Sequence, residues 1–130
     1  MAIFIPTIDK IIQFKVQPEP GELHLLRFLE RTLDDSFEVY FNPYMNGDRP
    51  DVIVMRKDYG VLIIEVKDWD LNLYELDDKK HWRLKSSPNA YPQSPVKQVL
   101  KYKENLFELH IENLLEKKIK DYRSFNMVRC

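Results

Sequence analysis

The sequence predicts a mixed α/β domain in which helices pack against a single β-sheet. Its 130 residues fit one domain, spanning 1–130, and leave little room for a second. A helical apolar stripe occupies residues 21–33, short apolar runs follow between 37 and 67, and a second helical pattern begins at residue 96. The expected order is therefore a helix, three strands of antiparallel type, a helix and a final strand.

The ends of the chain carry weaker signals than its centre. Two prolines and a glycine in "QPEPGE" (17–22) break any regular structure there. We therefore expect a core over about residues 20–115, preceded by an N-terminal extension over residues 1–19. The terminal "SFNMVRC" (124–130) resembles the start of a strand that is cut short.

The first helix is expected over residues 21–33. Leu26, Leu29 and Leu33 recur at helical spacing and so share one face, with Leu25 beside them. That face is predicted to pack on the sheet.

Three strands are expected next. Residues 37–41 form the first, and a loop over 42–50 separates it from the second at 51–55. The Gly-containing turn 56–60 then leads into the third strand at 61–67, so the last two strands form an antiparallel hairpin.

The remaining elements follow from the same patterns. Both faces of residues 61–64 are apolar, which predicts a central strand covered on both sides. Residues 71–76 and 81–85 alternate like a second hairpin, and the prolines of 86–95 indicate a loop. A helix is expected from Val96 to about Lys120.

Composition excludes several classes of protein. No apolar run approaches the roughly 20 residues needed to cross a bilayer, and Pro6, Asp9 and Lys10 make the N-terminus a poor signal peptide. The single cysteine, Cys130, allows no internal disulfide or cysteine-based zinc site. We expect a cytoplasmic protein with no membrane partner.

The charge is unevenly distributed although the net charge is −1. Residues 97–130 hold eight basic and five acidic residues, a formal charge of +3, which leaves −4 on residues 1–96. Taken alone, this uneven distribution of charge is explained by a solvated helix that carries charges of both signs. The weak net charge predicts low intrinsic affinity for DNA, which a partner domain would then supplement.

Charged residues gather where the central hairpin begins and ends. Alternation along the third strand places Val61, Ile63, Glu65 and Lys67 on one face. Asp51 opens the preceding antiparallel strand and so reaches the same corner of the sheet. Two carboxylates and a lysine at one corner are costly unless a cation neutralises them, and Mg²⁺ prefers carboxylate oxygens. A surface ion pair between Asp51 and Lys67 is the simpler alternative.

Glu22 lies in the middle of the apolar stripe of the first helix, four residues before Leu26. A solvated glutamate would not be expected on that face. Its position near the helix N-terminus is an alternative explanation, because a carboxylate stabilises the positive end of the helix dipole.

Gln98 and Tyr102 are four residues apart and share one face of the second long helix, flanked by Lys97 and Lys101. Polar side chains beside a basic edge suit a phosphate backbone, although an ordinary half-exposed face would look the same. Trp69 and Trp82 are expected to pack in the core or on a sheet face rather than to stack on bases. The face expected to pack on the sheet holds Val96, Val99, Leu100 and Phe107.

These residues together resemble a known family. Pro50-Asp51 followed by Glu65-Val66-Lys67 fits the PD-(D/E)xK motif of restriction endonuclease-like nucleases. The "PGE" opening, "HW", "SPVKQ" and the Gln98-x-x-x-Tyr102 element resemble the nuclease-related domain, NERD, over roughly residues 20–115.

The resemblance implies a restriction endonuclease-like core, a mixed β-sheet with an antiparallel hairpin flanked by helices in αβββαβ order. It also implies a metal-dependent DNA nuclease, an endonuclease-type hydrolase that uses Mg²⁺ or Mn²⁺. The implied metal ligands are Asp51, Glu65, the main-chain carbonyl of Val66 and Glu22, and Lys67 would serve the attacking water.

The resemblance further implies that Gln98 and Tyr102 orient the site and contact the substrate, while Lys97 and Lys101 lie along the DNA backbone. NERD domains are often joined to helicase, kinase or DNA-binding segments, so a DNA-processing partner in the same or a separate chain is expected. Two alternatives remain: a non-catalytic nucleic-acid or partner-binding module on the same fold, and a structural ion-pair cluster without a ligand.

Overall fold

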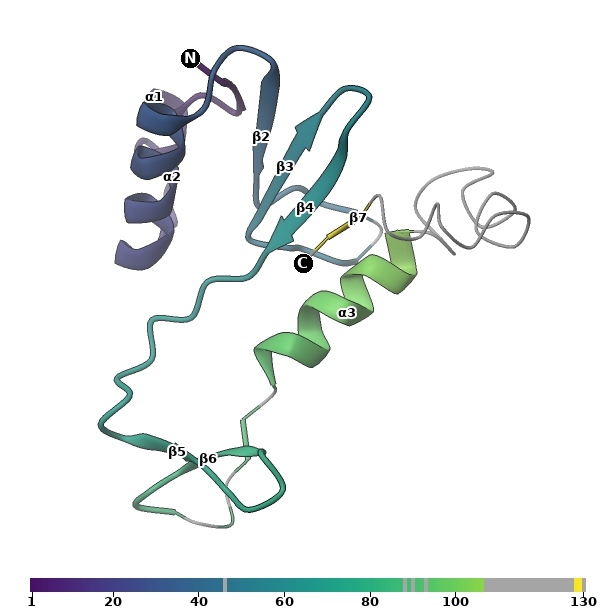
Figure 1. The fold of residues 1–130 in the computed structure, drawn as a ribbon. Helices are drawn as coiled ribbons and strands as arrows, with labels where there is room; N and C mark the ends of the chain where they lie inside the picture. The colour runs from purple at the N-terminus through teal and green to yellow at the C-terminus, as the bar shows by residue number, and fades with distance from the viewer. Residues whose placement is uncertain (46, 88, 90, 93, 107–127, 130) are drawn as a thin grey trace, which may run out of the picture.

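The computed structural model has a central mixed β-sheet with helices packed on both of its faces (Figure 1). It describes residues 1–45, 47–87, 89, 91–92, 94–106 and 128–129. The central strands lie in the order β1-β2-β3-β4-β7, with bounds β1 Ile3–Ile5, β2 Phe37–Phe41, β3 Val52–Arg56, β4 Gly60–Ile64 and β7 Val128–Arg129. The helices are α1 Ile8–Ile11, α2 Pro20–Thr32 and α3 Pro95–Asn105, and a separate hairpin is formed by β5 Tyr74–Leu76 and β6 Trp82–Leu84.

The middle of the sheet is an antiparallel meander, which confirms the mixed α/β class and the predicted hairpin. Strand β3 pairs antiparallel with both β2 and β4, and its register sets Val52 opposite Ile64. Gly60 closes the tight turn with a φ of 145°, a conformation that other residues rarely adopt. The outer strands β1 and β7 are both parallel to their neighbours.

One face of the sheet packs against α2. Leu26 and Leu29 are buried from the helix side, and Val39, Val52 and Val54 are buried from the strands. The predicted leucine stripe is confirmed, with Leu33 partly buried at its end. Burial of these aliphatic side chains is the main force that holds α2 on the sheet.

The opposite face packs against α3, though not through the residues expected. Val99, Tyr102 and Leu106 pack with Ile53 and Ile63. Their spacing of three and four residues gives a stripe that turns Val96 and Leu100 outward, and these two are 63% and 49% exposed. The predicted packing face was therefore wrong at both positions, and Phe107 lies outside the described residues.

The N-terminal segment contributes to the core rather than preceding it. Strand β1 pairs with β2, and Ile8 and Ile11 of α1 are buried beside Ala2. The backbone N–H of Ala2 also donates to the carbonyl of Leu33 at 3.2 Å. Residues 1–19 are thus not a simple extension, because the proline in their apolar run separates a strand from a helix.

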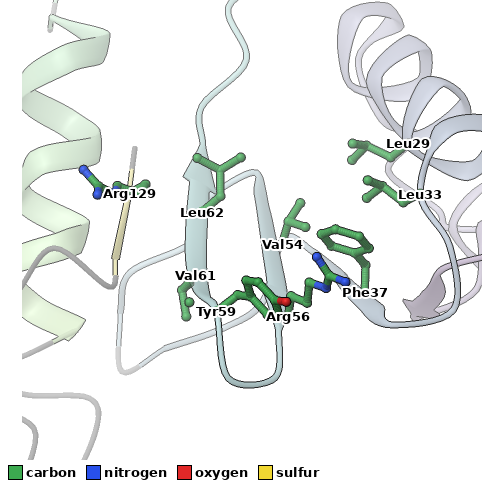
Figure 2. A pocket seen from close by; sticks show the side chains of 10 residues that line it. Leu29, Leu33, Phe37, Val54, Arg56, Tyr59, Val61, Leu62 and Arg129 are labelled. Carbon is green, nitrogen blue, oxygen red and sulfur yellow. The ribbon is translucent and has the colours of Figure 1, made fainter. Parts of the chain in front are cut away.

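Strand β4 is shorter and less covered than predicted. It ends at Ile64, so residues 65–67 lie beyond it. Leu62 is exposed in the described structure and lines an apolar groove of about 450 Å³ with Leu29 and Val54 (Figure 2). The expected final strand is present as β7, which pairs with β4.

The predicted second hairpin is confirmed as β5 and β6, which project away from the central sheet near the start of α3 (Figure 1). Trp69 stacks on Tyr74 with ring centroids 4.6 Å apart, and its ring also meets Trp82 edge-on at 5.7 Å.

Within the described ranges, no helix has both the length and the apolar character to cross a membrane.

Candidate active site

Asp51 is fixed at the entrance to β3. It follows the buried Pro50, and its carbonyl accepts a hydrogen bond from the backbone N–H of Asn42 at 2.7 Å. One carboxylate oxygen, Oδ2, accepts from the backbone N–H of Val66 at 2.8 Å. The antiparallel register of β3 and β4 brings these two segments together, as the sequence predicted.

Glu65 is a buried acid, with a side chain only 5% exposed. Its Oε1 lies 3.1 Å from Nζ of Lys67, while its Oε2 is buried without a hydrogen-bond partner among the described residues. Burial raises the pKa of Glu65, the bond from Lys67 opposes that rise, and the negative charge of Asp51 adds to it. A buried carboxylate oxygen with no donor is an energetic cost that a ligand would relieve.

Glu22 lies at the third position of α2 and completes a capping box. The N–H of Glu19 donates to Oε2 of Glu22 at 2.9 Å. Burial nevertheless raises the pKa of Glu22, the bond from Glu19 opposes this, and the charge of Asp51 raises it further. Glu22 therefore caps the helix and also lies near enough to Asp51 for the two charges to interact. We call Glu22, Asp51, Glu65 and Lys67 the acidic corner.

Asp68 is a contributor that sequence reasoning missed. Its Oδ2 accepts a hydrogen bond at 3.0 Å from the N–H of Gly21, in the first turn of α2. A Cβ at Gly21 would collide with the Asp68 carboxylate, so any larger residue there would displace this side chain and break the hydrogen bond. The only sequence signal was an acid directly after Glu65-Val66-Lys67, and it gave no partner.

Helix α3 is tied to the segment that leads into Asp51. Nε2 of Gln98 donates to the Tyr102 hydroxyl at 2.9 Å, and that hydroxyl donates to the carbonyl of Arg49 at 3.5 Å. One turn further on, Nδ2 of Asn105 donates to Oδ2 of Asp48 at 2.8 Å. Gln98 and Tyr102 are thus linked to each other and reach the acidic corner through the backbone beside it.

Two features of α3 bear on substrate contacts. Lys97 and Lys101 are both exposed, and neither forms a salt bridge with an acidic residue in the described part of the chain. Glu65 also lines a cavity of about 420 Å³ together with Pro95 and Val96. The first turn of α3 therefore borders the acidic corner directly.

A family model of the nuclease-related domain, NERD, matches residues 17–128. The chain belongs to the NERD family. The comparison with curated proteins found no match, and neither did the comparison with solved structures. The family match extends beyond the range of about 20–115 over which the motifs had suggested the resemblance.

The acidic corner of this NERD domain offers oxygen ligands for a hard divalent cation. No group of three or more His, Cys, Asp or Glu side chains is arranged as a metal centre within the described ranges. Mg²⁺, however, is commonly held by one or two carboxylates and keeps several waters. The donor chemistry of Asp51, Glu65 and the Val66 carbonyl fits such an ion, because Oε2 of Glu65 is buried and unpartnered.

Proposed function

We propose that this NERD domain is a metal-dependent DNA nuclease that hydrolyses phosphodiester bonds, with Asp51, Glu65 and Lys67 as its catalytic core. The observation that carries the proposal is the pairing within the acidic corner. Glu65 is almost fully buried, with one oxygen 3.1 Å from the Lys67 ammonium and the other unpartnered. An ion pair with Lys67 alone does not explain why the second carboxylate oxygen of Glu65 is buried without a partner among the described residues.

The metal in this proposal is Mg²⁺ or Mn²⁺, held by Asp51, Glu65 and the Val66 carbonyl, with Glu22 assisting. When bound, such an ion would polarise a phosphoryl oxygen and lower the pKa of a water molecule. The pKa values of Glu22 and Glu65 are raised first by burial and then by the charge of Asp51, and a bound cation would oppose both effects.

Lys67 acts on the attacking water in this scheme. Its side chain is 29% exposed, so Nζ reaches solvent while remaining beside Glu65. The water oxygen forms a bond to phosphorus and releases a proton to solvent, while the ester bond to the leaving oxygen breaks and that oxygen takes up a proton from solvent. Lys67 donates hydrogen bonds that orient the water, and its charge stabilises the developing negative charge on the phosphate.

The substrate contacts are assigned to α3. Lys97 and Lys101 meet the phosphate backbone, and Gln98 and Tyr102 hold the segment before Asp51 in place. We also assign the domain a restriction endonuclease-like core in αβββαβ order. A helicase or another DNA-processing domain, in the same chain or a separate one, supplies additional affinity for DNA.

One observation favours a second candidate function. Lys67 already neutralises one oxygen of Glu65 without any ion. If the acidic corner is satisfied in that way, the same fold serves as a non-catalytic module that binds nucleic acid or a protein partner.

A plasmid assay separates the two functions. Supercoiled plasmid is incubated with wild type in Mg²⁺, in Mn²⁺ and in excess chelator, and the same series is run with Lys67→Ala. Lys57→Ala, an exposed lysine in the β3–β4 turn, is the matched control. Cleavage that needs metal and Lys67 but not Lys57 supports the nuclease. Plasmid that stays intact with wild type under all conditions supports the binding module instead.

A further inference from the structure

A second cavity lies outside the acidic corner, between the β5–β6 hairpin and the start of α3. Its volume is about 310 Å³. It combines aromatic rings with basic and hydroxyl side chains, a mixture that the acidic corner lacks. The residues that line it are Lys80, His81, Trp82, Tyr91, Pro92, Ser94 and Lys97.

Aromatic contacts hold Trp82, one of the rings that line this cavity, in place. Trp82 is braced edge-on by Trp69, which is itself stacked on Tyr74. His81 and Tyr91 meet nearly at right angles, with centroids 6.3 Å apart, and Tyr91 remains 53% exposed. Both rings line the cavity, so aromatic surface is available there to a ligand.

Hydrogen bonds hold the β5–β6 turn, which contains Lys80, one of the two lysines that line the cavity. The Asp77 carboxylate accepts from the N–H groups of Lys79 and His81 at 2.9 and 2.8 Å, and the Asp77 N–H donates to the His81 carbonyl at 2.9 Å. Lys80 therefore sits in a closed turn with a φ of 60°. This pre-ordering reduces the entropy that a ligand would otherwise have to remove on binding.

We propose that this cavity binds an unstacked base of single-stranded DNA, with Lys80 and Lys97 on the neighbouring phosphates. Base–aromatic stacking and lysine–phosphate attraction are the two interactions that single-strand binding sites combine. A base within a duplex is stacked on both sides and cannot enter a cavity of this kind without being extruded. The inference rests on the proposed nuclease function and assigns that activity a substrate class, single-stranded or frayed DNA.

The cavity is placed to deliver a strand to the acidic corner. Ser94 and Lys97 line the base cavity, whereas the residues between them, Pro95 and Val96, line the cavity that contains Glu65. The two cavities therefore adjoin the same first turn of α3. When one base of a DNA strand is bound in this cavity, the next phosphates of that DNA strand lie beside the first turn of α3, which also borders the acidic corner.

The inference is tested by binding in excess chelator, so that no DNA is cleaved during the measurement. Fluorescence anisotropy gives the affinity of the full chain for a labelled thymidine oligonucleotide and for a duplex of the same length. The variants are Tyr91→Ala and Lys97→Ala. The controls are Tyr59→Ala and Lys57→Ala, an exposed tyrosine and lysine in the distant β3–β4 turn.

We expect wild type to prefer the single strand, and Tyr91→Ala to weaken that binding about tenfold. Lys97→Ala should lower the slope of log affinity against log salt by about 0.7. The two control variants should bind as wild type does. Equal affinity for duplex and single strand, or wild-type affinity in Tyr91→Ala, would overturn the inference.

The failure of the base cavity and the failure of the nuclease proposal can be told apart. A protein that binds single strands through Tyr91 but cleaves no DNA in Mg²⁺ refutes the nuclease and leaves the base cavity supported. A protein that cleaves duplex and single strand equally, with or without Tyr91, refutes the base cavity and leaves the nuclease supported.

Discussion

The Asp51 carboxylate accepts a hydrogen bond from the backbone N–H of Val66 at 2.8 Å. This bond joins the residue before β3 to the segment that follows β4. It fixes the peptide between Glu65 and Lys67, the two residues that flank Val66. Asp51 therefore has a structural role in the metal-free protein as well as its proposed role as a ligand.

Asp51→Ala and Asp51→Asn should separate these two roles. Alanine removes the acceptor for the Val66 N–H, so we expect a loss of about 1–3 kcal/mol in the free energy of unfolding. Asparagine keeps an acceptor oxygen and should retain most of that stability. Both variants should lose cleavage and bind Mn²⁺ more weakly. Denaturant melts and calorimetric titration check this, and an Asp51→Asn protein with wild-type Mn²⁺ affinity would contradict the ligand assignment.

Lys67→Ala should leave the fold and metal binding largely intact while abolishing cleavage, because Lys67 serves the water and not the ion. Without the ammonium, the pKa of Glu65 should rise further, since the Lys67 bond now lowers it. Mn²⁺ titration and the plasmid assay measure the two effects separately. A Lys67→Ala protein that cuts DNA at the wild-type rate would show that its assigned role is wrong.

The metal-free protein should become more stable as the pH is lowered from neutral towards 4.5, the ordinary pKa of a glutamate. The pKa values of Glu22 and Glu65 are raised above the ordinary 4.5, so the folded chain takes up protons that the unfolded chain does not. Their contribution is fully present below 4.5 and is lost as the pH rises through the raised values. The lowered pKa values of Asp34 and Asp77 act in the opposite sense, below their ordinary 3.8 and outside this window.

The measurement is a series of thermal melts in chelator across that pH range. Glu65→Gln should flatten the pH dependence, because the amide does not titrate. Mg²⁺ should flatten it as well if the ion replaces the proton at the acidic corner. A wild-type melting temperature that stays constant from neutral pH down to 4.5 would contradict the raised pKa values of these two acids.

The acidic corner could be predicted because antiparallel register is a short-range property. The three-residue turn 57–59 fixes which residue of β3 faces which residue of β4, and so Asp51 had to meet the end of β4. The alternation used to place Glu65 and Lys67 was incorrect in detail, since β4 ends at Ile64. Their side chains still meet, because the Asp51 bond holds the backbone after the strand.

The parts that could not be predicted depend on contacts between distant segments. Strand β1 is parallel to β2, and parallel strands are not joined by a short turn from which the pairing could be predicted. Asp68 reaches Gly21 across 47 positions of sequence, and nothing near either residue identifies the other. The predicted packing face of α3 was partly wrong because several apolar residues of this helix could have formed it. The shape of the sheet decides that Val99 and Tyr102, and not Leu100, pack against it.

The C-terminal strand should stabilise the domain. Val128 pairs with Val61 in parallel register and extends the sheet beyond β4. A version ending at Tyr122 should therefore melt at least a few degrees lower than the full chain. Val128→Pro removes one strand donor without shortening the chain and should shift the melting temperature in the same direction. Unchanged melting temperatures in both proteins would count against β7.

The decisive test of the acidic corner is Glu22→Gln, because glutamine preserves one of the two roles of Glu22. A glutamine at this position still accepts the Glu19 N–H, so the capping box survives. The negative charge that faces Asp51 is removed, which relieves the repulsion that raises the pKa of Glu22. We therefore expect the variant to be as stable as wild type, or more stable, in chelator.

In Mg²⁺ the same variant should cleave DNA more slowly, because the ion loses an assisting carboxylate. Glu30→Gln, which alters an acid on the same helix that pairs with Arg27 instead of facing Asp51, is the matched control and should cleave as wild type does. A helix cap without a role at the metal predicts that Glu22→Gln and Glu30→Gln behave alike in cleavage. If Glu22→Gln cuts DNA normally over the full range of Mg²⁺ concentrations, Glu22 is a cap only and the metal site is confined to Asp51, Glu65 and Val66.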